Sequence, residues 1–280
     1  MRIAFCVFNY NFDRLDTFIS ETFNLSRRKV KVLFSENRIL LNKKRARKGD
    51  KVSFKNLIEI DFKDEKFDYS EIKILNETDD FLIIYKPAEI HSEEIFKNKK
   101  SVENFLKQNF NENVKLLNRL DFNAQGLLIA SKNNDFYEKY KSLENEKKIE
   151  KFYLTFVEGK IFKKFTINAQ IDQNKRKIVK VLNKKSESTI TEVTPFAIYS
   201  NFSIITVKIF KGARHQIRAH LAYSNNPLIG DKLYGSNYLN FLKFFLFCYG
   251  YKCNELNLNF FEFSILKKRA KEYLMEFLGI

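Results

Sequence analysis

Short apolar segments follow one another at close spacing from Ile72 onward. Phe81–Tyr85 is a continuous apolar run ended by Pro87, which predicts a buried strand. Lys151–Val157 has the alternating side-chain pattern of a strand, and both of its faces are apolar. The other segments with strand character are Leu127–Ala130, Thr166–Ile171, Thr189–Val193, Phe202–Ile209, Phe244–Tyr249 and Leu256–Phe263. Because these strands are joined without regular helical crossovers, we expect an α+β fold with a mixed, mainly antiparallel sheet and flanking helices.

Helical segments separate several of these strands. The sequence predicts a helix from Ser101 to Phe110, another over Asp135–Leu143, a third starting near His215 and a fourth closing the chain. Hydrophobic residues make up 44% of the 280 residues and aromatic residues 15%, enough for a packed core and too much for a disordered chain. This length allows one large domain or two small ones.

The region Arg14–Lys55 is strongly basic. It holds 13 Lys or Arg against 4 Asp or Glu, so more than half of the chain's net charge of +16 lies in this stretch. We expect two short helices here, the second over Arg27–Phe34, then a strand over Arg38–Asn42, a turn over Arg45–Asp50 and a strand over Lys51–Phe54. The basic edge of such a module attracts phosphates, although a charge run of this kind can also be a solvated helix face.

Four stretches of this region resemble the S4 RNA-binding domain, a family that grips structured RNA with its helices and the following loop. The similar residues are Arg14–Ile19, Leu25–Val30, Ile39–Asn42 and Arg47–Val52. The resemblance implies an S4-like domain over residues 1–62 and an acidic, aromatic linker over 63–71, ahead of a larger domain over 72–280. The RNA-binding candidates are the cations of these stretches: Arg14, Arg27, Arg28, Lys29, Arg47 and Lys48.

The cysteine content and the apolar runs bear on the compartment. Three scattered cysteines argue for a reducing compartment and against a disulfide framework, and they form no convincing metal motif. The apolar run Ile3–Phe8 is far shorter than the ~20 residues of a spanning helix, so no membrane segment is expected. The expected location is therefore the cytoplasm.

Asp121 lies in a segment that enters the predicted strand Leu127–Ala130. Gly126 allows a tight backbone approach there, and a carboxylate at the mouth of a sheet can act as nucleophile or base. Considered alone, a loop aspartate is more often a turn or cap residue.

Two further segments carry residues that could take part in catalysis or binding. If Lys211–Ala222 is helical, Arg214 and Arg218 share a face, and an arginine near a buried carboxylate keeps that carboxylate ionised. His215 and His220 do not share a face, which suits hydrogen bonding or phosphate contact better than metal binding. Tyr153 sits in an aromatic strand, where core packing is the simpler explanation.

Taken together, these segments resemble the RluA-type pseudouridine synthases over about 200 residues. The matching motifs, in the family's order, are Lys86-Pro87-Ala88, Arg119-Leu120-Asp121, Gly126-Leu127-Leu128, Lys151-Phe152-Tyr153, Gly212–Leu221 and Pro227–Gly235. The resemblance implies a pseudouridine synthase fold and isomerisation of uridine in structured RNA without a cofactor or metal. Asp121 would be the nucleophile, which attacks the sugar or the base or acts as a base.

The same resemblance assigns the remaining roles. Arg218 would pair with Asp121, and Tyr153 would stack on the uracil and help remove a proton. Arg119 would fill the gap left by the everted base or contact phosphate, and Arg214 and His215 would contact RNA. The partner would be structured RNA, ribosomal in preference to transfer RNA, bound by a monomer.

The chain departs from the family pattern at several positions. Asn118 stands where the family usually has His, Ala124 and Gln125 replace Thr-Ser, Glu89 replaces Gly, and Ala213-Arg214 replaces Arg-Thr. These departures affect substrate positioning more than the expected reaction.

Two other functional classes remain. One is a non-catalytic RNA-binding or ribosome-assembly factor built on the same fold. The other, a basic protein of membrane surfaces, is disfavoured because no amphipathic helix opposes a polybasic face with large apolar anchors.

Overall fold

The computed structural model describes residues 2–7, 14–23, 25, 27–61, 68–94, 100–110, 113–172, 178–238, 241 and 243–279. Within these, the residues of Met1–Asp68 and Glu94–Ser101 form one compact unit, and those of Tyr69–Glu93 and Val102–Ile280 form a second. Among the described residues, no helix is both long enough and apolar enough to cross a membrane.

The first unit packs two helices on a four-stranded antiparallel sheet of order β1-β4-β2-β3. Its elements are β1 (Arg2–Cys6), α1 (Leu15–Thr22), α2 (Arg27–Ser35), β2 (Ile39–Leu41), β3 (Lys44–Arg45) and β4 (Leu57–Asp61). Leu15, Ile19 and Val30 of the helices are buried against Ile58 and Ile60 of β4. The helices therefore owe their stability to this shared core more than to their short sequences.

The predicted strand over Lys51–Phe54 is wrong. Ser53 N–H donates to Asn56 Oδ1 at 2.7 Å, and Lys55 has a positive φ of 67°. Val52 makes a β-bridge, and Ser53–Asn56 form a turn, because an asparagine side chain that binds the backbone replaces a strand ladder there. The strand follows the turn, as β4.

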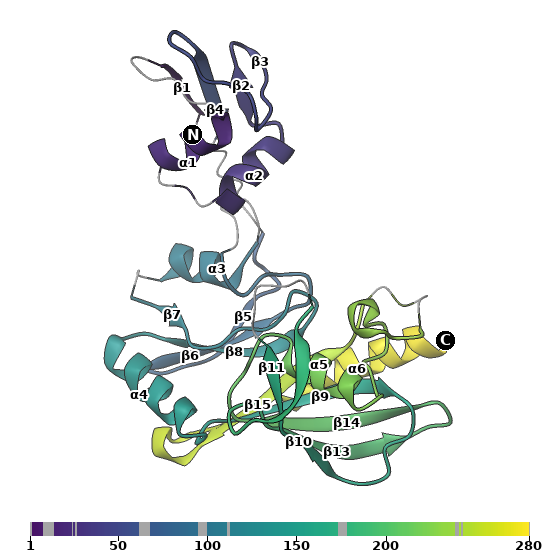
Figure 1. The fold of residues 1–280 in the computed structure, drawn as a ribbon. Helices are drawn as coiled ribbons and strands as arrows, with labels where there is room; N and C mark the ends of the chain where they lie inside the picture. Colours follow the sequence, from purple (N-terminus) through teal and green to yellow (C-terminus); the bar gives the residue numbers. More distant parts are fainter. Residues whose placement is uncertain are drawn as a thin grey trace. The chain divides into compact units, whose positions relative to one another are not determined.

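The second unit holds the remaining elements (Figure 1). Its strands are β5 (Lys73–Glu77), β6 (Phe81–Lys86), β7 (Lys115–Leu116), β8 (Gln125–Ser131), β9 (Glu150–Glu158), β10 (Phe165–Ile167), β11 (Ala169–Asp172), β12 (Lys180–Lys185), β13 (Thr191–Ile198), β14 (Phe202–Ile209), β15 (Leu246–Cys253) and β16 (Leu258–Phe261). Its helices are α3 (Val102–Asn109), α4 (Asn134–Asn145), α5 (Gln216–Tyr223) and α6 (Phe263–Leu278), with short 3₁₀ turns η1 (Lys232–Tyr234) and η2 (Asn254–Leu256).

The main sheet runs in the order β10-β13-β14-β9-β15-β8-β6-β5, with β16 paired to β15 and β7 to β8. Among the described strand pairs, β15 with β8 is parallel and the others are antiparallel. The predicted α+β class with a mixed, mainly antiparallel sheet is confirmed. A separate two-stranded hairpin, β11 with β12, completes the unit.

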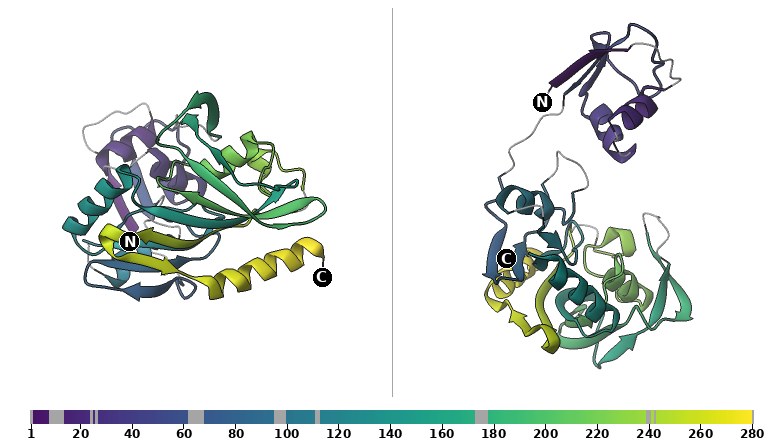
Figure 2. Two further views of the ribbon diagram at one scale, coloured as in Figure 1. Left: turned by 90° about the horizontal axis from the view of Figure 1, so that it is seen from below. Right: turned by 90° about the vertical axis from the view of Figure 1, so that its left-hand side faces the viewer.

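Both faces of β9 are covered, as its two apolar faces require. On one face Phe156 packs with Phe245 and with Tyr273 of α6. On the other, Lys151 is buried and pairs with Glu144 of α4. The left view of Figure 2 shows α6 along one face of the sheet and α5 on the opposite face.

Some strand boundaries differ from those predicted. Thr166–Ile171 divides into β10 and β11, which pair with different strands. β13 extends to Ile198 through Pro195, because a register shift between Pro195 and Ala197 accommodates the residue that cannot donate to the ladder. The sequence pattern does not predict β5, β7 or β12, which carry many exposed polar residues.

Gly126 permits the close approach that its position suggests. It has a φ of +112°, and a Cβ at this position would collide with the backbone of Cys248. Gly126 faces Cys248 where β8 and β15 pair. A glycine is therefore needed where the segment carrying Asp121 enters the centre of the sheet.

Candidate active site

Asp121 lies in the loop between β7 and β8, and neighbouring backbone holds that loop on one side. Ser92 Oγ donates to the carbonyl of Leu120 and accepts from its N–H, both at 2.9 Å. The carbonyl of Phe122 accepts from the Glu89 N–H at 2.7 Å. The residues on either side of Asp121 are thus fixed before any substrate binds.

Asn118 holds the loop on its other side. Its Oδ1 accepts from the Ile129 N–H at 3.0 Å, and its Nδ2 donates to the hydroxyl of Tyr251 at 2.6 Å. That hydroxyl donates in turn to the carbonyl of Leu127 at 2.8 Å. The asparagine that departs from the family pattern is therefore engaged in joining the loop to β8 and β15.

Helix α5 presents Arg218 toward this loop. His215, directly before the helix, has a positive φ of 54°, so the chain turns sharply into α5. Gln216 fixes that turn, since its Oε1 accepts from the Ala213 N–H at 3.0 Å and its Nε2 donates to the Ile190 carbonyl at 3.0 Å. Arg214 precedes the helix, so the predicted shared helical face of Arg214 and Arg218 is wrong.

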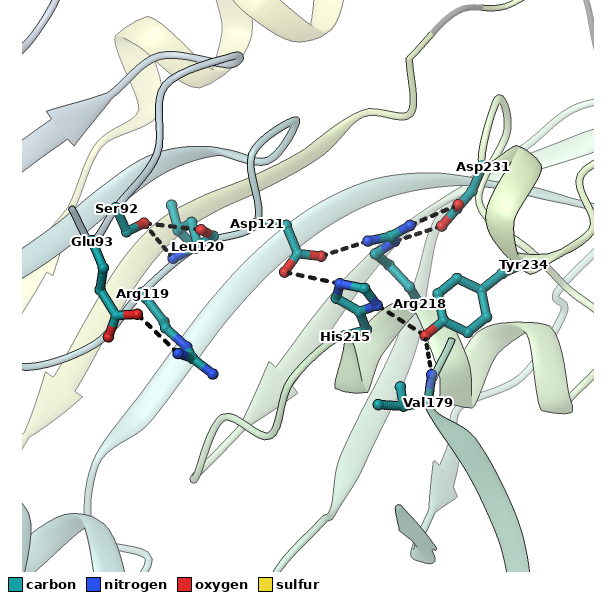
Figure 3. Close-up of polar contacts among 10 residues, drawn as sticks. All are labelled: Ser92, Glu93, Arg119, Leu120, Asp121, Val179, His215, Arg218, Asp231 and Tyr234. Carbon is teal, nitrogen blue, oxygen red and sulfur yellow. Dashed lines mark hydrogen bonds and ion pairs between the residues drawn. The ribbon is translucent and has the colours of Figure 1, made fainter. Parts of the chain in front are cut away.

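Arg218 lies between two aspartates (Figure 3). Its Nη1 donates to Asp121 Oδ2 at 2.8 Å, while Nε and Nη2 donate to the two oxygens of Asp231 at 2.6 and 2.9 Å. The side chains of Arg218 and Asp231 are only 7% and 2% exposed, whereas that of Asp121 is 23% exposed. Of the three charged groups, Asp121 is the one that solvent, and hence a substrate, reaches most easily.

The guanidinium also has aromatic neighbours. Its central carbon lies 4.4 Å from the ring centre of Phe244 and 5.0 Å from that of Tyr234. Burial alone would lower the pKa of Arg218, but the hydrogen bonds to Asp231 and the charge of Asp121 outweigh it, so the pKa is raised. Arg218 is therefore a permanent cation beside Asp121.

His215 reaches the second oxygen of Asp121. Its Nε2 lies 3.9 Å from Asp121 Oδ1, and its Nδ1 lies 3.0 Å from the Tyr234 hydroxyl. That hydroxyl also accepts from the Val179 N–H at 3.2 Å, beside β12 (Figure 3). Burial lowers the pKa of His215, and the Arg218 and Arg214 cations add to this effect against the opposing charge of Asp121. His220, by contrast, binds Thr191 Oγ1 and the Ala169 carbonyl within the fold.

Tyr153 lies on β9, on the same face as Lys151, which pairs with Glu144 of α4. It is 5% exposed and lies opposite Cys248 of β15. Burial, with smaller contributions that include the charge of Asp121, raises the pKa of Tyr153 well above its ordinary value. The phenol is therefore neutral at ordinary pH.

Lys86, at the end of β6, is a buried cation below the same loop. Its Nζ donates to the carbonyls of Pro87 at 2.9 Å, Ile90 at 2.7 Å and Phe122 at 3.4 Å. Burial lowers the pKa of Lys86 to about 7, while the charge of Asp121 opposes this shift. Lys86 thus ties the residue after Asp121 to the Lys86-Pro87-Ala88 segment.

Of the predicted RNA-binding residues in the second unit, Arg119 does not join this cluster. Arg119 points to the surface, where its Nη1 lies 3.0 Å from Glu93 Oε2 and both side chains are 56% exposed. In the first unit, Arg14 pairs with Asp16 at 2.8 Å, Arg27 and Arg47 are exposed, and Lys48 is half-buried. The side chains of Arg28 and Lys29 lie outside the described residues.

Three site residues received no role from the sequence: Asp231, Tyr234 and Lys86. The first two lie in the Pro227–Gly235 motif and the third opens the Lys86-Pro87-Ala88 motif, so the motifs marked the segments without indicating what these side chains contact. They leave the Asp121 carboxylate partly exposed and in direct contact with the buried guanidinium of Arg218. Such a site suits nucleophilic or base chemistry on an uncharged substrate group.

Comparison with known proteins gives a consistent set of relatives. Residues 80–223 match the family model described as RNA pseudouridylate synthase. An "Uncharacterized RNA pseudouridine synthase" of Helicobacter pylori (strain J99 / ATCC 700824) is 32% identical over 165 residues, covering 58% of this chain and 63% of the relative. "Ribosomal large subunit pseudouridine synthase D" of Borreliella burgdorferi is 27% identical over 292 aligned residues, covering 94% of this chain and 86% of the relative.

A solved structure supports the fold. "Human RNA Pseudouridylate Synthase Domain Containing 1" aligns with a TM-score of 0.55 at 20% identity, covering 68% of this chain and 81% of that one. At this identity the likeness concerns the fold alone.

Proposed function

Because the chain belongs to the RNA pseudouridylate synthase family, whose members are isomerases, we propose that Asp121 is the nucleophile that converts uridine to pseudouridine in structured RNA. The observation that carries this assignment is the ion pair of Asp121 with Arg218, whose guanidinium is itself held by the buried Asp231. A carboxylate oriented by a buried guanidinium in this way is placed to act as a nucleophile.

The reaction breaks the bond from ribose to a uracil nitrogen, turns the detached base and joins it again through carbon. No redox change occurs, so no cofactor is required. Tyr153 stacks on the uracil and helps remove the proton from the new attachment carbon; its neutral phenol assists through hydrogen bonding, since its raised pKa makes it a poor base. The target nucleotide leaves its stack to reach Asp121, at a cost of a few kcal/mol.

The test is Asp121→Asn in a tritium-release assay on RNA labelled at uracil C5. The amide keeps the size of the side chain but not its charge, so we expect turnover to fall by about 10⁴-fold or more. Asp135→Asn, an exposed aspartate of α4, is the matched control and leaves turnover unchanged. Full activity of Asp121→Asn would refute the assigned role.

The alternative is a non-catalytic RNA-binding or ribosome-assembly factor on the same fold, and the family and its named relatives favour the enzyme. In a deletion strain, the alternative predicts that Asp121→Asn restores growth while loss of the Arg27, Arg28 and Lys29 charges does not. The enzyme predicts that Asp121→Asn fails to restore pseudouridine.

Large-subunit ribosomal RNA is the proposed substrate class, with transfer RNA as the alternative. Support comes from the Borreliella burgdorferi relative, whose name gives the large ribosomal subunit and which aligns with 94% of this chain. Mapping pseudouridines in RNA from the deletion strain identifies the site, and a missing modification in transfer RNA instead would overturn this choice.

The first unit is proposed to be an S4-like domain that holds the RNA. Its order of two helices followed by the β2–β3 hairpin, with exposed Arg27, Arg45 and Arg47, supports this proposal. We further propose that the protein acts in the cytoplasm as a monomer. Sedimentation of the purified protein tests the oligomeric state.

A further inference from the structure

Phe122, the residue after Asp121, exposes an aromatic ring beside the candidate active site. It is 42% exposed, although the flanking Leu120 and Ala124 are buried at 9% and 1%. Its ring lies 4.6 Å from the ring of His91, centre to centre, at an angle of 37°. Isolated exposed apolar residues are common on proteins, so exposure alone assigns nothing.

The backbone that presents this ring is fixed from both sides. The Phe122 carbonyl accepts from the Glu89 N–H at 2.7 Å and from Lys86 Nζ at 3.4 Å, and the Ala124 N–H donates to the Asp121 carbonyl at 3.1 Å. These bonds fix the backbone of Phe122, and the contact with His91 gives the ring itself a neighbour.

The segment that carries His91 runs along the loop that carries Phe122. Glu93 pairs with Arg119 at 3.0 Å, Ser92 bonds Leu120 at 2.9 Å, and His91 contacts Phe122. The two segments thus form a strip with the Arg119–Glu93 ion pair at one end and two aromatic rings at the other, and Phe122 directly follows Asp121 in the chain. Aromatic rings on which bases stack are one of the features that proteins use to bind single-stranded nucleic acid.

We propose that Phe122 and His91 form a stacking subsite for the nucleobase that neighbours the target uridine in the RNA. The inference rests on the proposed function and adds to it. When the target nucleotide turns out toward Asp121, its neighbour loses one stacking partner. Phe122 directly follows Asp121, and consecutive α-carbons are about 3.8 Å apart, so the two side chains start from neighbouring points of one loop. Stacking tolerates any base, so the subsite contributes affinity rather than sequence choice.

The experiment measures KM and kcat by tritium release from total RNA of a strain lacking the gene, grown on uridine labelled at C5. Phe122→Leu keeps an apolar side chain but removes the flat ring, so KM rises about tenfold while kcat stays within about twofold. Phe122→Trp restores a stacking surface and keeps KM near the wild-type value. Phe162→Leu, which alters another exposed phenylalanine at 69% exposure, leaves both parameters unchanged.

The outcomes separate this inference from the proposed function. A KM of Phe122→Leu equal to that of Phe162→Leu, or a Phe122→Trp variant as weak as Phe122→Leu, overturns the stacking subsite while the enzyme remains. No release by the wild type, or full release by Asp121→Asn, overturns the proposed function instead. Matching thermal unfolding of the Phe122 variants and the wild type excludes a folding defect as the cause of a raised KM.

Discussion

Asp231 binds Arg218 through both of its carboxylate oxygens, at 2.6 and 2.9 Å, and is itself only 2% exposed. This bidentate contact leaves Nη1 as the part of the guanidinium that reaches Asp121. A planar fork held at one edge cannot rotate, so Asp231 sets the direction from which Asp121 is approached.

Replacing Asp231 with Asn tests this relationship. The amide keeps one acceptor but turns an N–H group toward the guanidinium, so we expect turnover to fall 10- to 100-fold, with a smaller change in KM. The free energy of unfolding should fall by about 3 kcal/mol, since a buried cation loses a partner. Tritium release and urea unfolding measure the two effects.

A matched control for Asp231 is Glu272→Gln on α6. Glu272 pairs with Arg269 at 3.1 Å, with both side chains 40% or more exposed. Exposed pairs contribute about 0–1 kcal/mol, so neither turnover nor stability should change appreciably. If the two variants behave alike, Asp231 has no special role.

Tyr153→Phe separates stacking from proton transfer. The ring remains, so KM should hold, while loss of the hydroxyl should slow turnover by at least about a hundredfold. Tyr140→Phe is the control, because its buried hydroxyl has no hydrogen-bond partner within the described part of the chain. Unchanged turnover of Tyr153→Phe would limit Tyr153 to a packing role.

Lys86 predicts a pH-dependent stability. Burial lowers the pKa of folded Lys86 to about 7, against the ordinary value of 10.5 in the unfolded chain. Between these values the unfolded state binds more protons, so the stability of the wild type relative to Lys86→Met should rise with pH, by up to about 1.4 kcal/mol per unit. Below pH 7 the difference should level off. Urea unfolding from pH 6 to 10.5 measures it, and a difference that falls with pH would contradict the assignment.

Gly126→Ala should disrupt the centre of the sheet. The new Cβ would meet the Cys248 backbone at a positive φ, so we expect a loss of about 3 kcal/mol in unfolding free energy. Gly235→Ala shares a positive φ of 85° but has open space around it, and should lose only about 1 kcal/mol. Equal losses for both glycines would mean that the approach to Cys248 is unimportant.

Removing two exposed cations of the first unit tests its proposed grip on RNA. Arg27→Gln with Arg47→Gln should weaken RNA binding at low salt and reduce the slope of log affinity against log salt by about 1.5. Filter binding across a potassium chloride series gives the slope. Lys267→Gln with Lys268→Gln, two exposed positions of α6, removes the same charge elsewhere and should have a smaller effect.

The sequence predicted the parts of this fold that depend on local pattern. The apolar runs gave most strands of the main sheet, because buried strands need continuous or two-sided apolar character. The strands that the pattern did not predict include β5 and β12, whose exposed polar side chains give their sequences a loop-like composition.

The sequence motifs predicted only part of the site. The expected contact of Arg218 with Asp121 is present, although 97 residues separate them. The role of Asp231 was not predicted, because its contact with Arg218 depends on the path that the chain takes after α5. Lys86 escaped because lysines are almost never buried and its partners are backbone carbonyls, which no residue pattern reveals.

The position of β15 has a consequence for biosynthesis. Strand β15, residues 246–253, lies between β8 and β9 in the sheet. Strand β8 follows the loop of Asp121, and β9 carries Tyr153. A nascent polypeptide therefore lacks the strand that joins β8 to β9, and with it the connection between the segments of Asp121 and Tyr153, until β15 has emerged from the ribosome. The order of the strands therefore makes completion of the central sheet a late event in the synthesis of this chain.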